Sequence, residues 1–142
     1  MQVSSWKVED LIPHHPPMVL IDNIESVNLE SSSLVASFTA KEQWRGNWFA
    51  IEYMAQTAAA LAGAFDKVSD DGARGRPGLL LGTRRLELGI AEFVPGVHYF
   101  VKAVREYVDG DSAAFACEIW EAGGESKSAK CTATLTAYHG NL

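Results

Sequence analysis

The segment Trp48–Lys67, near the middle of the chain, has the pattern of a helix that is apolar on nearly every side. Apolar residues recur along one face at intervals of three and four, which is the spacing of an α-helix. The members of this face are Ile51, Met54, Ala55, Ala58, Leu61, Ala62 and Phe65. Alanines fill most of the other positions, so we expect protein to surround the helix. Any fold of this chain must therefore cover one long helix on most of its sides.

Glu52 is the residue that does not fit this apolar helix. Burying an unpaired carboxylate costs several kcal/mol, so a chain seldom keeps one without a use for it. Glu52 could simply favour the helix dipole, but with Asn47 as the N-cap it lies about five residues into the helix, which is late for that role. Gln56 lies one turn further on and can share its face, and the small residues Ala59 and Gly63 follow. The pattern favours an acid, an amide and a smooth strip along which a slim apolar chain could lie.

Length and composition are those of an ordinary globular protein. A chain of 142 residues fits a single domain, which we place at residues 1–142, and 47% of the residues are hydrophobic against 21% charged. There is no apolar run of about 18 residues and no signal pattern in the first residues, so we expect a cytoplasmic location and no membrane span. The net charge of −6 argues against nucleic-acid binding. Cys117 and Cys131 lack metal-ligand spacing, so we expect reduced core cysteines, no metal and no cofactor.

Four arginines lie close together in the second half of the chain. They are Arg74, Arg76, Arg84 and Arg85. Most clusters of this kind are solvated surface, but the planar fork of donors on an arginine also suits an acidic partner or a phosphate. The sequence alone leaves both interpretations open.

The remaining segments have the patterns of short strands and turns. They predict, in order, a helical turn at Trp6–Leu11, strands at Met18–Asn28 and Leu34–Ala40, the long helix, a loop at Ser69–Gly78, and four strands in meander at Leu79–Leu88, Val97–Tyr107, Ala113–Glu121 and Ser128–Tyr138. One curved antiparallel sheet can wrap a single apolar helix, so this order predicts an α+β hot-dog fold around one long central helix. An α+β sandwich with the helix on one face is the alternative. A second subunit could close the side that the sheet leaves open.

Four segments resemble a known enzyme family. They are Leu11–Asp22, with its Pro13-His-His-Pro-Pro17 motif, Ile51–Gln56, Leu79–Arg85 and Phe93–Gly96. Through them the chain resembles bacterial 3-hydroxyacyl-[acyl-carrier-protein] dehydratases, and most of all the dehydratase-like subunit of aryl-polyene biosynthesis. The resemblance implies a hot-dog dimer that acts on acyl thioesters of a carrier protein, paired either with its own copy or with a second hot-dog subunit.

The implied reaction is the loss of water from a 3-hydroxyacyl thioester to give the trans-2-enoyl thioester. It needs a base for the α-proton and an acid for the departing hydroxyl group. By resemblance, Glu52 is that acid, and Gln56 holds its carboxyl group or the substrate. Trp48 and Phe49 could roof an acyl tunnel, although such aromatic residues more often pack in a core. The four arginines would be the docking patch for an acidic carrier protein.

The histidine that the family uses as its base is missing from its expected place. The usual dehydratase supplies it from a loop before the helix acid, across the dimer interface, whereas this chain has no histidine between His15 and His98. Three explanations stay open: a different subunit supplies the histidine, His14 replaces it, or the chain is a non-catalytic subunit that binds acyl chains or stabilises a partner. A hot-dog thioesterase, in which Glu52 activates water or attacks the carbonyl, is a further alternative. His98 and His139 have the character of surface residues.

Overall fold

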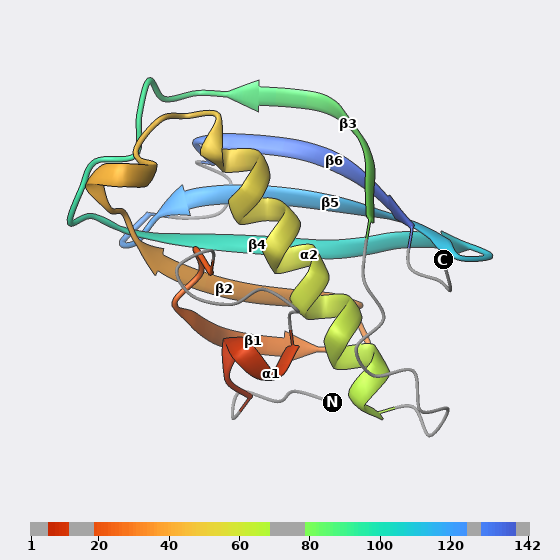
Figure 1. Cartoon of the computed structure of the whole chain (residues 1–142). Coiled ribbons are helices and arrows are strands. Elements are labelled where there is room, and N and C mark those ends of the chain that lie inside the picture. Colours follow the sequence, from red (N-terminus) through yellow and green to blue (C-terminus); the bar gives the residue numbers. More distant parts are fainter. Residues whose placement is uncertain (1–5, 12–18, 69–78, 125–128, 139–142) are drawn as a thin grey trace.

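A six-stranded antiparallel sheet and one long helix make up most of the computed structural model, which describes residues 6–11, 19–68, 79–124 and 129–138. The elements are α1 (Val8–Leu11), β1 (Asn23–Asn28), β2 (Ser33–Thr39), the 3-10 turn η1 (Glu42–Trp44), α2 (Phe49–Val68), β3 (Leu79–Leu88), β4 (His98–Asp109), β5 (Ser112–Glu121) and β6 (Cys131–Tyr138). The curved sheet lies behind α2 and extends past it on both sides (Figure 1). This is the predicted α+β hot-dog arrangement.

The order of strands differs in one respect from the predicted meander. In the sheet the order is β1-β2-β4-β5-β6-β3, so only β4, β5 and β6 form a meander, and β3 pairs with β6 at the far edge. The predicted pairing of β3 with β4 was wrong because both sides of β4 are already taken. One side pairs with β2, and the other joins β5 through a two-residue turn in which Gly110 has a positive φ of 61°.

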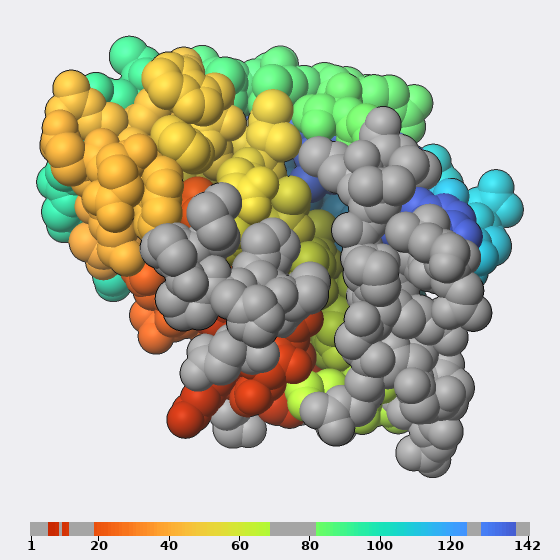
Figure 2. Space-filling model, viewed as in Figure 1, coloured from red at the N-terminus to blue at the C-terminus, as the bar shows by residue number. Residues whose placement is uncertain are grey.

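Helix α2 lies against the inner face of the sheet and against α1. Its buried residues are Ala50, Tyr53, Met54, Gln56, Thr57, Ala58, Ala60, Leu61 and Ala64. A narrower face stays half-buried, and it carries Ile51, Glu52, Ala55, Ala59 and Ala62. Parts of the helix are visible at the surface of the molecule in the space-filling view (Figure 2). The helix is therefore covered on most sides, as predicted, but this chain leaves one face incompletely covered.

The first strand begins later than predicted. The sequence predicts a strand at Met18–Asn28, whereas β1 begins at Asn23. Leu20 and Ile21 are buried, but the backbone N–H of Leu20 donates to the side chain of Gln56 on α2 and not to a neighbouring strand. The chain thus passes along the helix before it joins the sheet. At the other end, the strand predicted from Ser128 begins at Cys131, and the predicted Ser69–Gly78 loop lies outside the described residues.

Four aromatic rings fill the space between the sheet and the first turns of α2. Phe38 stacks on Tyr53 with ring centroids 3.7 Å apart, and Phe93 and Tyr99 complete the cluster. Burial, together with the nearby charge of Asp22, raises the pKa of Tyr53, so this phenol stays neutral. The cluster fixes the N-terminal end of α2, which is the end that carries Glu52.

The two cysteines are buried and free, as the sequence predicts. Burial raises the pKa of the Cys117 thiol and of the Cys131 thiol, which makes both poor nucleophiles. In the described ranges no helix is long and apolar enough to cross a membrane.

Replacing Gly63 with alanine should destabilise the protein, although alanine is the better helix former by about 1 kcal/mol. A methyl group at this position would overlap the backbone carbonyl of Leu11, so α1 and α2 would have to move apart. We expect the free energy of unfolding, measured by urea titration, to fall by about 1–3 kcal/mol. Gly82→Ala is the matched control, because its methyl would meet no described atom within 4 Å. An unchanged or higher stability for Gly63→Ala would contradict this packing.

Candidate active site

Glu52, Gln56 and the backbone of Leu20 form a chain of hydrogen bonds on one flank of α2. The side-chain amide nitrogen of Gln56 donates to Oε1 of Glu52 at 2.9 Å. The amide oxygen of Gln56 accepts the N–H of Leu20, also at 2.9 Å. Gln56 is fully buried, whereas Glu52 is half-buried. The structure therefore brings together the acid and the amide that the sequence singles out.

The bond from Leu20 decides which way the amide of Gln56 points. A backbone N–H can only donate, so it must face the amide oxygen, and the NH₂ group is then left to face the carboxyl group of Glu52. Because that NH₂ group needs an acceptor, Oε1 of Glu52 has to offer a lone pair. Because a carbonyl oxygen accepts better than a hydroxyl oxygen, this contact favours Oε2 as the place of the proton when the carboxyl group is protonated. The arrangement can hold one oxygen of an acid in place while the other delivers a proton.

Small side chains continue from Glu52 along the half-buried face of α2. Ala55, Ala59 and Ala62 follow it at helical spacing, and none of them projects beyond a methyl group. Trp48 precedes Glu52 by one turn, is 66% exposed and packs over Gly46. Phe49 packs against the edge of the core, with its ring 5.8 Å from that of Trp48. Of the two aromatic residues predicted to bind substrate, only Trp48 is well exposed.

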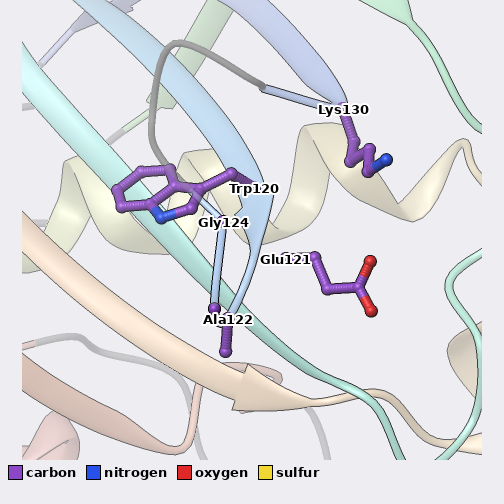
Figure 3. Close-up of a pocket in the computed structure, with 6 residues that line it drawn as sticks. Trp120, Glu121, Ala122, Gly124 and Lys130 are labelled. Carbon is purple, nitrogen blue, oxygen red and sulfur yellow. The ribbon is translucent and has the colours of Figure 1, made fainter.

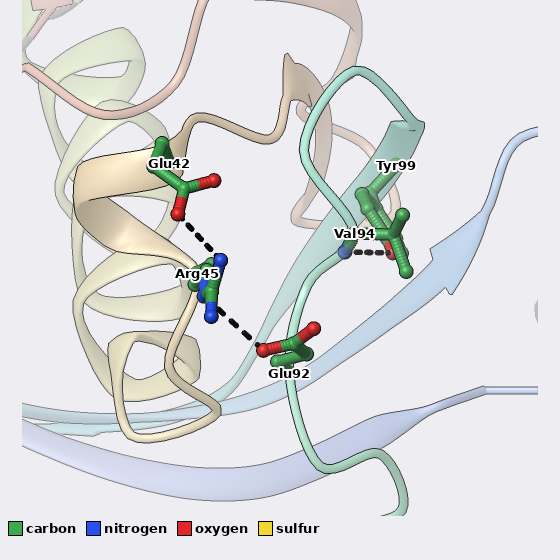
Figure 4. A network of polar contacts seen from close by, with 5 residues as sticks. All are labelled: Glu42, Arg45, Glu92, Val94 and Tyr99. Atoms are coloured by element: carbon green, nitrogen blue, oxygen red, sulfur yellow. Dashed lines mark hydrogen bonds and ion pairs between the residues drawn. The ribbon is translucent and has the colours of Figure 1, made fainter.

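The connection that precedes α2 is held by ion pairs. Arg45 contacts the carboxylate of Glu42 and, at 3.2 Å, that of Glu92 (Figure 4). The backbone N–H of Phe93 also donates to the carbonyl of Arg45 at 2.7 Å. These contacts tie the connection to the segment between β3 and β4. The resemblance predicts a histidine in this part of the chain. The connection instead carries Arg45, whose guanidinium group pairs with the carboxylates of Glu42 and Glu92.

His98 is the histidine that falls within the described ranges. It is exposed at the start of β4, where its Nδ1 lies 2.6 Å from the hydroxyl oxygen of Thr39. This placement agrees with the predicted surface role. His14 and His139 lie outside the described residues. No group of three or more His, Cys, Asp or Glu side chains in the described ranges is placed to hold a metal ion.

Two of the four arginines in the predicted docking patch lie within the described residues. Arg84 and Arg85 are exposed neighbours on β3, at an irregularity where the pairing with β6 shifts and Arg85 has a positive φ of 55°. That bulge allows two consecutive side chains to reach solvent from an edge strand. Arg74 and Arg76 lie outside the described residues.

A shallow pocket of about 340 Å³ lies at the turn after β5, and its residues are separate from Glu52 and Gln56. Trp120, Glu121 and Lys130 are among the residues that line it (Figure 3). The pocket lies on the side of the sheet away from α2, as the position of the helix behind the strands shows. It does not extend the site around Glu52.

Solved structures of the same fold place the chain among hot-dog proteins. A chain of the dehydratase heterocomplex ApeI:P from Xenorhabdus doucetiae is similar with a TM-score of 0.82 and 24% identity, covering 96% of this chain and 92% of that one. A putative thioesterase related to phenylacetic acid degradation, from Ralstonia eutropha, has a TM-score of 0.62 and 19% identity, covering 81% and 82%. A hypothetical thioesterase solved with coenzyme A, from Streptococcus pneumoniae, has a TM-score of 0.63 and 11% identity, covering 84% and 86%. The predicted hot-dog fold is confirmed.

The family is narrower than the fold. The chain belongs to the ApeP-like family of ApeP dehydratases, whose model matches residues 6–141. This confirms the resemblance to the dehydratase-like subunit of aryl-polyene biosynthesis and makes the chain a member of a dehydratase family within the hot-dog fold. No curated protein matches the sequence.

Two contacts of α2, one in the site and one at its other end, could not be found from the sequence. The N–H of Leu20 lies 36 positions before Gln56, and no local pattern links the two. Arg105 stacks on Phe65 at the other end of α2, with its guanidinium carbon 3.7 Å from the ring centroid. The sequence showed only an arginine in a strand and an apolar residue in a helix.

Replacing Gln56 with leucine should destabilise the protein, because it leaves the buried N–H of Leu20 without an acceptor. We expect the free energy of unfolding to fall by about 1–3 kcal/mol. Glu52→Gln is the comparison, since it removes a half-buried carboxylate and leaves the contact between Gln56 and Leu20 in place. Chemical denaturation of both variants would measure the difference, and equal stabilities would argue against the proposed importance of the Leu20 bond.

Proposed function

We propose that the chain takes part in dehydrating a 3-hydroxyacyl thioester of an acyl carrier protein to the trans-2-enoyl thioester, with Glu52 as the acid. The observation that carries the proposal is the carboxyl group of Glu52, held by Gln56 on the central helix of a dehydratase family member. The family supports dehydration, and the geometry supports the role of the residue. The carrier protein as the source of the thioester is our inference from the resemblance of the motifs.

The chemistry follows from what each group can do. A base removes the acidic α-proton, the C–O bond at the 3-position breaks, and the departing hydroxyl group takes the proton of Glu52 and leaves as water. Gln56 keeps Oε1 of Glu52 in place, so Oε2 is the oxygen that gives up the proton. Glu52 lies on the half-buried face of α2, where a substrate lying on the alanine strip would reach it. Gln56 is a positioning residue in this scheme.

The base is proposed to come from a second hot-dog subunit. The sequence has no histidine between His15 and His98, and His98 is engaged with Thr39. The face of α2 that carries Glu52 is incompletely covered in this chain, which suits contact with another subunit. The similar X. doucetiae structure is that of a dehydratase heterocomplex, and this supports a partner that differs from this chain. His14 as a base within the chain is the competing assignment.

Glu52→Gln should strongly slow dehydration in the complex of this chain with its co-purifying partner. Loss of the acid is expected to slow the reaction by about 100- to 10,000-fold, because an amide of the same shape cannot donate the proton. Mass spectrometry of a 3-hydroxyacyl carrier-protein thioester, which loses one water on conversion, measures the rate. Glu118→Gln, a half-buried glutamate on the opposite face of the sheet, is the matched control and should leave the rate unchanged.

The same assay separates the alternatives. An unchanged rate for Glu52→Gln, with the complex intact, would mean that this chain binds or stabilises and does no chemistry. Dehydration by the chain alone, lost in His14→Ala, would place the base within the chain and overturn the partner assignment. Formation of a free 3-hydroxy acid would indicate a thioesterase.

The carrier protein is proposed to dock on the four arginines at positions 74, 76, 84 and 85. Arg84 and Arg85 are exposed side by side on β3, and carrier proteins are acidic, so opposite charges would meet. These arginines would mainly raise the rate at which the carrier protein associates with the chain, and this rate increase would become smaller as salt is added.

Charge reversal of all four arginines to glutamate should weaken carrier-protein binding by about tenfold at low salt and by less at high salt. Surface plasmon resonance at two ionic strengths would measure both effects. The control is the double variant Lys41→Glu, Lys102→Glu, which reverses charge on segments that do not pair with β3. If the quadruple variant binds as tightly as the wild type at both salt concentrations, the carrier protein docks elsewhere.

A further inference from the structure

Arg105 is a half-buried cation without a protein counter-ion in the described structure. Its backbone N–H donates to the carbonyl of Ser32 at 2.8 Å, which fixes this part of β4 beside the turn between β1 and β2. Its guanidinium group stacks on the ring of Phe65, with the central carbon 3.7 Å from the ring centroid. Within the described ranges, no carboxylate forms an ion pair with it and no side chain forms a hydrogen bond to it.

The environment keeps this guanidinium charged and leaves its donors available. Burial lowers the pKa of Arg105, but an arginine stays protonated at neutral pH. Stacking uses only the flat face of the group, so its N–H donors around the rim still need acceptors. The donors that reach solvent can bond to water or to an anion that displaces it, and a phosphate is the anion whose geometry suits an arginine best.

Arg105 lies on the face of the sheet that meets α2. Tyr99, Val101 and Ala103 alternate with it along β4 and are all buried beneath the helix, whereas Lys102 points to the opposite face. Phe65, its stacking partner, is on α2 itself, near the C-terminal end. The cation therefore lies at one end of the helix, and Glu52 lies near the other.

The separation of these two groups matches the length of a substrate arm. The helix rises 1.5 Å per residue, so the stretch from Glu52 to Phe65 is about 20 Å long. The pantetheine arm of a carrier-protein thioester has about thirteen bonds between its sulfur and its phosphorus. An extended chain advances about 3.5 Å for every three backbone bonds, so this arm spans about 15 Å. The guanidinium–phosphate contact and the substrate atoms between the sulfur and the 3-hydroxyl group supply the remaining length.

We infer that Arg105, backed by Phe65, binds the phosphate of the pantetheine arm while the thioester lies at Glu52. The inference rests on the proposed function for the identity of the thioester. A phosphate matches the planar fork of an arginine through two parallel hydrogen bonds, and it would supply the anion that the described structure lacks. Because an α-helix has about 3.6 residues per turn, Phe65 lies about 140° around the axis from Glu52, so the arm would pass the alanines at positions 55, 59 and 62 and then the flank of the helix to reach Arg105. Arg105 would thus set the distance at which the reacting carbon stops.

The test compares the binding of 4′-phosphopantetheine with that of pantetheine, which differs only in lacking the phosphate. Isothermal titration of the full chain, alone and in the complex with its partner, gives both dissociation constants. In the wild type the phosphate should tighten binding by about tenfold, the effect of one charge-assisted contact. In Arg105→Met this advantage should disappear while pantetheine binding stays as before. Lys102→Met removes a cation from the other face of the same strand and should keep the advantage.

The outcomes are separable from those for the proposed function. Neither ligand carries an acyl group, so a chain that dehydrates nothing can still show the phosphate effect, and Glu52→Gln should preserve it. An advantage that persists in folded Arg105→Met, checked by its melting temperature, would overturn the assignment, as would a wild type that does not distinguish the ligands. Arg105→Met should also weaken binding of the phosphopantetheine-bearing carrier protein relative to its unmodified form. An equal loss of affinity for the phosphopantetheine-bearing and the unmodified carrier protein would mean that Arg105 contacts the carrier protein itself.

Discussion

Two segments that are far apart in the sequence, helix α2 and the stretch around Leu20, meet at the side chain of Gln56. It is fully buried beside α2, it accepts the N–H of Leu20, and it donates to Glu52. A buried amide in an apolar setting is tolerated only when its polar atoms are satisfied, so the course of residues 19–22 along the helix and the position of the acid are fixed together. The segment reaches Gln56 before it joins the sheet, and its first backbone bond to β2 comes from the N–H of Asp22, which donates to the carbonyl of Ser37. Strand β1 therefore begins only at Asn23. A requirement of the core thus orients the carboxyl group that we propose as the acid.

The sequence predicted the features that depend on local spacing. Residues 49–68 form a helix within one residue of the predicted bounds, and Glu52 and Gln56 share a face because the helical repeat places them one turn apart. The hot-dog fold followed from one apolar helix among short strands. The sequence could not predict the place of β3, because that depends on which edge of the sheet is free once β4 has paired on both sides. The stacking of Arg105 on Phe65 depends on register across two elements, which no local pattern contains.

The two ends of α2 carry different groups, so a ligand that lies along the helix meets a different chemical environment at each end. The N-terminal end rests on the aromatic cluster of Phe38, Tyr53, Phe93 and Tyr99 and presents a carboxyl group. The C-terminal end presents a cation stacked on an aromatic ring. Between them the helix offers methyl groups. An arm with a phosphate at one end and an acyl thioester at the other has the same polarity. If the cation takes the phosphate and the carboxyl group meets the acyl thioester, as proposed, the two ends of the helix favour one orientation of such a molecule.

The place of β3 also affects how the chain is made. This strand leaves the ribosome before β4, β5 and β6, yet its only partner in the described sheet is β6, which is synthesised last. During that interval it is an apolar strand with both edges unpaired, the state in which chains most readily join the wrong neighbour. Arg84 and Arg85 interrupt it at the bulge with two adjacent positive charges. Like charges on the same strand of another nascent copy repel each other, so the residues that face solvent in the finished protein also keep unfinished chains apart.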